Sequence, residues 1–199
     1  MTIKEFISKF KNNLKLYIFL VNIFVLLSIF ISLVIPIAYR SDFSVMTISN
    51  SDNDVYNSIK SADKFADFMG KVVHTDKFFV YVLDTDYDVS ISDFNTDNRK
   101  RRKEWGNMIL TSRIPDSGIV DFQVFGETKK KSSEYALAIK EVLINDFDVF
   151  YGENTNLTIK ELNSIIVSNN PKRPNFLLNL AIGLVFGVVV ASTVVYTKK

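Results

Sequence analysis

Residues 176–196 read FLLNLAIGLVFGVVVASTVVY and contain no charged side chain. Because about 20 consecutive apolar residues cross the hydrocarbon core of a bilayer as a helix, this stretch predicts a transmembrane helix. Gly183, Gly187 and Ala191 recur at intervals of four residues, which places three small residues on one helical stripe. In lipid such a stripe lets two helices approach closely, so we expect this helix to pack against α-helical structure in the same chain or in a neighbouring protomer.

A second uncharged apolar stretch, Leu16–Ala38, lies near the N-terminus. It is longer than the apolar core of a signal peptide, which has about 7–15 residues, so we expect an uncleaved anchor. Asn22 interrupts the run and is a candidate for a hydrogen bond across a helix pair, the alternative being a tolerated polar residue. Four lysines against one glutamate precede the run and predict a cytoplasmic N-terminus (Lys4, Lys9, Lys11, Lys15 and Glu5).

Two spans return the C-terminus to the cytoplasm, which sets the predicted order of the chain. That order is a cytoplasmic N-terminus (1–15), a first transmembrane helix (16–38), an extracytoplasmic domain (39–175), a second transmembrane helix (176–196) and a cytoplasmic C-terminus (197–199). The net charge of +2 over 199 residues is too small to indicate nucleic acid as a partner. The chain has no cysteine, which excludes disulfide and thiol chemistry.

The middle of the chain alternates strand and helix patterns and predicts an α+β fold, a compact mixed α/β domain between the two transmembrane helices. Strands are expected at Phe43–Ile48, Phe78–Leu83, Ile119–Phe125 and Leu162–Val167, with Val89–Ile91 extending the second strand or pairing back on it. Phe78–Leu83 is continuously apolar, which is typical of a buried central strand. Helices are expected from Ser51 to Gly70, from the capping residues at 96–98 to Ile109, and through Tyr135 to Phe150.

The sequence offers little for catalysis or metal binding. His74 is the only histidine, and no serine lies in a G-x-S-x-G motif. Asp84, Asp86 and Asp88 alternate as in a calcium loop, but Val89 and Asn95 stand where such a loop needs glycine and glutamate. We therefore expect a polar turn there, no catalytic residue, no metal site and no cofactor.

The run Arg99-Lys100-Arg101-Arg102-Lys103 is the densest charge feature of the chain. One interpretation is a contact with glycan, anionic lipid or a neighbouring subunit through Arg99, Arg101 and Arg102, since clustered cations concentrate positive potential. The other is a solvated helix face. Positive charge at a helix N-terminus opposes the helix dipole, and this conflict favours the first interpretation.

The layout of the whole chain resembles the polysaccharide co-polymerases, the Wzz-type chain-length determinant proteins of bacterial surface-glycan assembly. The segment Ile114-Pro115-Asp116-Ser117-Gly118-Ile119-Val120 looks like the family's "vPgSglI" motif at the start of a strand, and Ala136–Leu143 matches the helix that follows it. The strand Ser164–Val167 then leads through Pro171 and Pro174, expected to position the second span, to the glycine-bearing helix. The chain departs from the family in its compact middle domain and in its short C-terminal tail.

The resemblance implies a non-enzymatic scaffold in the bacterial cytoplasmic (inner) membrane. Protomers would form a homo-oligomer beside a membrane-embedded polysaccharide polymerase and set how long the growing polysaccharide becomes, whether O-antigen, capsule or exopolysaccharide. The alternative is a membrane-anchored adapter or sensor whose extracytoplasmic α/β domain binds a ligand. Little chain is expected on the cytoplasmic side to carry a signal, which favours the scaffold.

Overall fold

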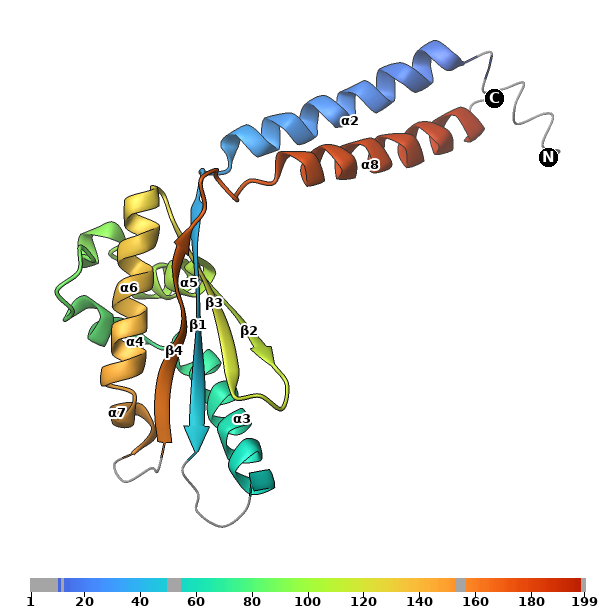
Figure 1. Cartoon of the computed structure of the whole chain (residues 1–199). Coiled ribbons are helices and arrows are strands. Elements are labelled where there is room, and N and C mark those ends of the chain that lie inside the picture. The colour runs from blue at the N-terminus through green and yellow to red at the C-terminus, as the bar shows by residue number, and fades with distance from the viewer. Residues whose placement is uncertain (1–10, 12, 50–54, 153–156, 198–199) are drawn as a thin grey trace. The chain divides into compact units, whose positions relative to one another are not determined.

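The computed structural model describes residues 11, 13–49, 55–152 and 157–197. It contains two compact units, Ala38–Pro171 and a unit that combines the residues up to Ile37 with those from Lys172 onward (Figure 1). The latter unit contains α2 (Leu14–Val34) and α8 (Phe176–Thr197), both long and apolar enough to cross a membrane. The prediction of a mixed α/β unit between two apolar helices is confirmed at this level. Helix α2 ends before Ala38 because Pro36 holds Ile35 in an extended conformation.

The α/β unit is built on one antiparallel sheet with the strand order β2-β3-β1-β4. Its strands are β1 (Tyr39–Ser49), β2 (Ile109–Ile114), β3 (Ile119–Gly126) and β4 (Leu157–Val167). The central strands β1 and β3 pair with Phe43 opposite Phe122, and their rings stack 5.0 Å apart. Side chains alternate between the two faces of each strand, so the stacked pair belongs to one face only.

Helices cover that face, whereas most side chains on the other face of β1 and β3 are only partly buried. The helices are α3 (Val55–Val72), α4 (Asp76–Leu83), α5 (Asn98–Met108), α6 (Lys129–Asn145) and α7 (Asp148–Tyr151), with a 3₁₀ turn η1 (Ile91–Asp93). The order of the main elements, strand, helices, hairpin, helices and strand, is the split β-α-β arrangement. Within it, Val120, Phe122 and Val124 of β3 pack with Ala136 and Ile139 of α6 in a single apolar core.

Three of the predicted strands and most of the predicted helical segments are confirmed. Phe43–Ile48, Ile119–Phe125 and Leu162–Val167 lie within β1, β3 and β4. The expected cap at Ser51 lies outside the described residues, and α3 continues past Gly70 to Val72. The last predicted helix is interrupted at Asp146 and forms α6 and α7.

The prediction of a central strand at Phe78–Leu83 is wrong, because these residues form α4. Thr75 caps the helix by accepting a hydrogen bond from the Phe78 amide at 3.3 Å. Phe78, Phe79 and Val82 then share one buried helix face, whereas Val80 is exposed. A short apolar run fits a buried strand and a buried helix equally well, and here the cap and the exposure of Val80 distinguish them.

The fourth strand of the sheet is β2, an edge strand that sequence patterns did not predict. Ile109 was assigned to the end of a helix, yet it begins β2 opposite Val124. The prediction of a strand at Val89–Ile91 is also wrong. Val89 is a buried loop residue, and Ile91 is the first residue of the turn η1, which Ser90 caps. The acidic segment therefore connects helices and not strands.

Gly126, at the end of β3, is required by close packing. A Cβ atom built there would lie 2.5 Å from the Ser132 amide nitrogen and 2.8 Å from the Ser132 Cα, which are backbone atoms of α6. Ser132 is itself fixed, because its Oγ lies 2.9 Å from Ser41 Oγ of β1 in the buried core. The first turn of α6 therefore sits directly on β3.

We expect Gly126→Ala to destabilise the α/β unit by about 1–3 kcal/mol, because the added methyl group forces the α6 backbone away from the sheet. Gly106→Ala is the matched control, since nothing lies within 4 Å of its Cβ position inside α5. Alanine favours a helix over glycine, so this control should stabilise by up to about 1 kcal/mol. The measurement is urea unfolding of the full chain in detergent, followed by the fluorescence of Trp105, the only tryptophan. Equal midpoints for the two variants would contradict the packing argument.

Candidate functional site

Helices α2 and α8 pack against each other along the small residues of α8. Gly183, Gly187, Ala191 and Val195 are the buried residues of that helix, and we call them the α8 stripe. A Cβ atom at Gly183 would lie 2.5 Å from Ser28 Oγ of α2, and one at Gly187 would lie 3.1 Å from Val21 Cα. The two helices therefore approach closely within a single chain, and glycine at 183 and 187 allows that approach.

Polar side chains cross the same helix pair. Asn179 Nδ2 donates a hydrogen bond to Ser32 Oγ at 2.8 Å, and Ser32 Oγ donates to the Ser28 carbonyl at 3.0 Å. Asn179 precedes Gly183 by four residues, so it continues the line of the α8 stripe. Sequence reasoning overlooked Asn179, although its spacing from Gly183 is visible in the sequence.

Asn22 lies elsewhere than predicted. Its Nδ2 donates to the Ile18 carbonyl of its own helix at 2.9 Å, and its side chain is exposed, so it makes no contact across the pair. A polar group in an apolar helix can be satisfied by the carbonyl one turn before it, which makes Asn22 a tolerated polar residue.

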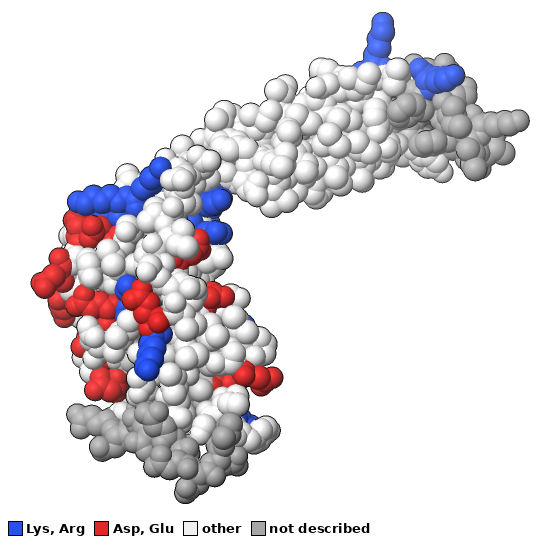
Figure 2. Space-filling view, viewed as in Figure 1, with Lys and Arg blue, Asp and Glu red and all other residues white. Residues whose placement is uncertain are grey.

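Apart from Lys15 near the start of α2, the outward surfaces of α2 and α8 carry no charged side chain (Figure 2), and most of their exposed side chains are apolar. Leu33 is 70% and Leu177 is 78% exposed, values at which a large aliphatic side chain requires an apolar environment. Hydrocarbon satisfies that requirement, and each helix satisfies its own backbone hydrogen bonds. The pair therefore buries its small residues and the Asn179–Ser32 contact and exposes mainly apolar side chains, as expected of two membrane-spanning helices.

The two prolines expected to position the second span lie between β4 and α8. Pro171 is the last residue of the α/β unit, and Pro174 follows a cis peptide bond with Arg173. After them, Asn175 Oδ1 accepts a hydrogen bond from the Leu178 amide at 3.1 Å and so caps the first turn of α8. The prolines end the strand region and the asparagine begins the helix.

The structure separates the residues of the basic run Arg99–Lys103. Asp97 caps α5 by accepting from the amides of Arg99 and Lys100, both at 3.0 Å. Arg102 forms a two-bonded ion pair with Asp76 at the start of α4, and the hydrogen bond between these side chains lowers the pKa of Asp76. The Arg101 guanidinium lies 5.7 Å from the centre of the Phe79 ring. Arg101 and Arg102 thus contribute to packing within the unit.

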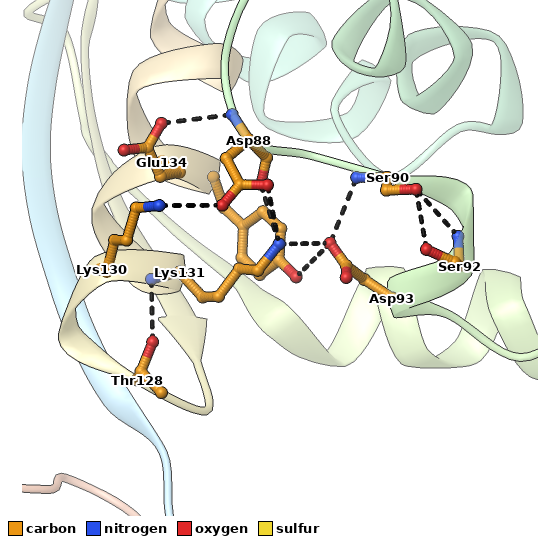
Figure 3. Close-up of polar contacts among 9 residues, drawn as sticks. Asp88, Ser90, Ser92, Asp93, Thr128, Lys130, Lys131 and Glu134 are labelled. Atoms are coloured by element: carbon orange, nitrogen blue, oxygen red, sulfur yellow. Dashed lines mark hydrogen bonds and ion pairs between the residues drawn. The ribbon is translucent and has the colours of Figure 1, made fainter.

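The acidic segment that resembled a calcium loop is tied to α6 by lysines (Figure 3). Lys131 Nζ lies 2.8 Å from Asp93 Oδ2 and donates to the Asp88 carbonyl at 3.0 Å, while Lys130 Nζ lies 3.1 Å from Asp88 Oδ2. Tyr135 Oη also donates to Asp93 at 3.2 Å. We call Asp88, Asp93, Lys130, Lys131 and Tyr135 the lysine clamp. It binds the connection between α4 and α5 to the first turns of α6.

The clamp explains how α6 begins at Lys129, after the Thr128 cap, despite three consecutive lysines. Thr128 Oγ1 accepts from the Lys131 amide at 3.1 Å, and the two aspartates compensate the charge that opposes the helix dipole. Hydrogen bonds from Lys130 and Lys131 lower the pKa of Asp88. Partial burial acts to raise the pKa of Asp93, but the hydrogen bonds from Lys131 and the Ser90 amide outweigh it, and that pKa is lowered overall.

The remaining candidates do not form a catalytic or metal centre in the part of the chain that the structure describes. His74 lies in the turn after α3, and its partial burial lowers its pKa. No group of three or more histidine, aspartate or glutamate side chains converges there. The carboxylate oxygens of Asp88 form ion pairs with Lys130 and Lys131, which would compete with a metal cation for these oxygens.

A scan of protein-family models finds no match to this chain, and a search of curated proteins finds no significant match either. Its function is therefore inferred from its residues and their geometry.

We expect Gly183→Leu combined with Gly187→Leu to separate α2 from α8, because leucine side chains would occupy the space of Ser28 and Val21. Val185→Leu combined with Val189→Leu is the control, since both valines are more than half exposed. The chain has no native cysteine, so spin labels can be placed on cysteines introduced at Val34 and Phe176 alone. The distance distribution between the labels should broaden in the glycine variant and stay narrow in the control. An unchanged distribution in the glycine variant would contradict the role of the stripe.

For the lysine clamp, we expect Lys131→Met to lower the stability of the α/β unit at pH 7 by about 1 kcal/mol. Because the folded-state pKa values of Asp88 and Asp93 lie below the unfolded value of about 3.9, their stabilisation is present above pH 4 and is lost as the pH falls through the lowered values. The difference in stability between variant and native chain should therefore narrow as the pH falls below about 4. Lys64→Met, at an exposed position of α3, is the control. Thermal unfolding across this pH range is the measurement, and a difference independent of pH would refute the clamp.

Proposed function

We propose that this chain is a two-pass protein of the bacterial inner membrane that regulates the length of a surface polysaccharide as a non-enzymatic scaffold. Its α/β unit would lie on the extracytoplasmic side, with both termini in the cytoplasm. It would act as a homo-oligomer beside a polysaccharide polymerase embedded in the same membrane. The observation that carries the proposal is the pairing of α2 with α8, two apolar helices that bracket a single split β-α-β domain.

The residues that resemble the co-polymerase family lie at structurally coherent positions, which supports the proposal. Ile114–Val120 forms the end of β2, the hairpin turn and the start of β3. Within the turn Gly118 has a φ of 69°, and a Cβ there would lie 2.7 Å from the Thr47 carbonyl oxygen of β1. Glycine is required at this position for both reasons. Ala136–Leu143 lies in the buried part of α6, and Ser164–Val167 ends β4.

The helix pair also constrains how protomers associate. The α8 stripe is occupied by α2 of the same chain, so contacts between protomers must use the outer helix surfaces or the α/β units. Edge strands β2 and β4 each leave one side without a strand partner in the described sheet, and such edges pair readily with other chains. A scaffold that sets chain length needs self-association of this kind and no reacting group of its own.

The test is the length distribution of the surface glycan, displayed as a ladder on a gel, from source cells with and without this gene. Deletion should convert a cluster of bands at a preferred length into a broad distribution, and the native chain should restore the cluster. Gly183→Leu with Gly187→Leu should fail to restore it at equal protein level, whereas Val185→Leu with Val189→Leu should succeed. An unchanged ladder on deletion would rule out chain-length control and direct attention to an adapter or sensor role.

A further inference from the structure

Helix α5 presents a cationic face on the side opposite its buried residue. At 100° per residue, Arg99, Lys100 and Lys103 lie within about 100° of one another around the helix axis, and all three are exposed. Trp105, on the opposite side, is buried and donates its Nε1 hydrogen to the Val73 carbonyl at 2.7 Å. We call Arg99, Lys100 and Lys103 the α5 face.

The three cations of this face are available to a partner. Arg101 and Arg102 are held by Phe79 and Asp76, whereas Arg99, Lys100 and Lys103 form no ion pair with any described residue. The acidic side chains next to them in the chain already form hydrogen bonds. Asp97, the N-cap, accepts from backbone amides of α5, and Glu104 accepts from the Asn95 amide at 2.8 Å. Of the five residues in the basic run, Arg101 and Arg102 therefore contact other side chains of the unit, whereas Arg99, Lys100 and Lys103 are exposed without an ion pair.

Presenting these charges carries a stability cost that packing does not explain. Arg99 and Lys103 are four residues apart, and like charges at this spacing repel on a helix surface. The face also lies in the first half of α5, where positive charge opposes the helix dipole. Neutral residues at the three positions would leave the Trp105 contacts intact and remove both costs.

The shape and composition of the face indicate the kind of partner. It is the convex side of a helix, which suits a polymer with repeated negative charges better than a single small anion. Helices that insert into lipid place tryptophan, phenylalanine or leucine beside their basic residues, and the solvent side of α5 has none of these: its apolar residues, Trp105 and Met108, pack on the core. An acidic polymer that stays in water fits better than a bilayer surface.

We propose that the α5 face binds an acidic polysaccharide, whose carboxylates or phosphates contact Arg99, Lys100 and Lys103. The α5 face by itself indicates an acidic polymer; that this polymer is a polysaccharide, and the growing one, rests on the proposed function. The contact is electrostatic and multivalent, so its affinity falls as salt is added. It also implies that the polysaccharide whose length is regulated carries negative charge.

The test uses the full chain in nanodiscs of zwitterionic lipid, with polygalacturonate as the acidic probe and dextran of similar size as the neutral one. The native chain should bind polygalacturonate, with weaker binding at high salt, and should not bind dextran. Arg99→Glu/Lys100→Glu/Lys103→Glu should weaken binding at least about tenfold. The matched control is Lys60→Glu/Lys64→Glu/Lys160→Glu, which reverses three other exposed lysines and should keep the native affinity within about twofold.

Arg99→Gln/Lys100→Gln/Lys103→Gln is the second variant, and it should also lose affinity while Trp105 fluorescence shows the native fold. Equal losses in the α5 variants and the lysine control would overturn the proposal, because binding would then follow net charge alone. Equal binding of dextran would overturn it as well. Loss of binding to phosphatidylglycerol vesicles, with no loss to polygalacturonate, would assign the face to lipid instead.

These outcomes are separable from those of the glycan ladder. A ladder that broadens on deletion, together with no polygalacturonate binding, would retain the proposed function and remove this inference. Specific binding by the α5 face with an unchanged ladder would retain an acidic-glycan site and remove chain-length control.

Discussion

The antiparallel pairing of β1 with β4 is the constraint on which the rest of the structure depends. Ser41, near the start of β1, lies opposite Val167, the last residue of β4. The chain therefore enters and leaves the sheet at the same end, and short connections of 35–38 and 168–175 lead to the two apolar helices. Because the ends of the domain are adjacent, α2 and α8 can pair within one chain. A parallel β4 would have ended at the opposite end of the sheet from the start of β1, too far for such connections.

The α2–α8 contact then uses two kinds of interaction that work in lipid. Glycine at 183 and 187 lets the backbones approach, and Asn179 is satisfied by Ser32 inside the pair. In a bilayer neither interaction would depend on the exclusion of water, which drives packing in the α/β unit. The two units are thus stabilised by different physics, close van der Waals contact in one and burial of an apolar core in the other.

Within the α/β unit some basic residues form ion pairs with aspartates, and others are exposed without such a pair. Lys130 and Lys131 bind the aspartates of the α4–α5 connection, and Arg102 binds Asp76. These pairs add to the core contacts of Phe79, Phe94 and Trp105, which hold a region that contributes no strand to the described sheet. Arg99, Lys100 and Lys103 on α5 therefore remain exposed, while the acidic side chains near them already form hydrogen bonds or ion pairs.

Sequence patterns predicted the structure correctly where a periodic, local arrangement of residues decides it. The uncharged length of 176–196, the four-residue spacing from Gly183 to Ala191 and the alternation of Val120, Phe122 and Val124 each report a periodic environment, and each was predictable. Tertiary structure decided the rest. Phe78–Leu83 forms a helix because Thr75 caps it and its buried side chains lie on one helix face, and Ile109 lies in the sheet because it pairs with Val124 of β3. Likewise, Asn22 donates a hydrogen bond within its own helix, whereas Asn179 donates one to Ser32 of the other helix. Which polar residue can form a hydrogen bond between the helices depends on which helix faces are in contact, and this is determined only when the helices pack.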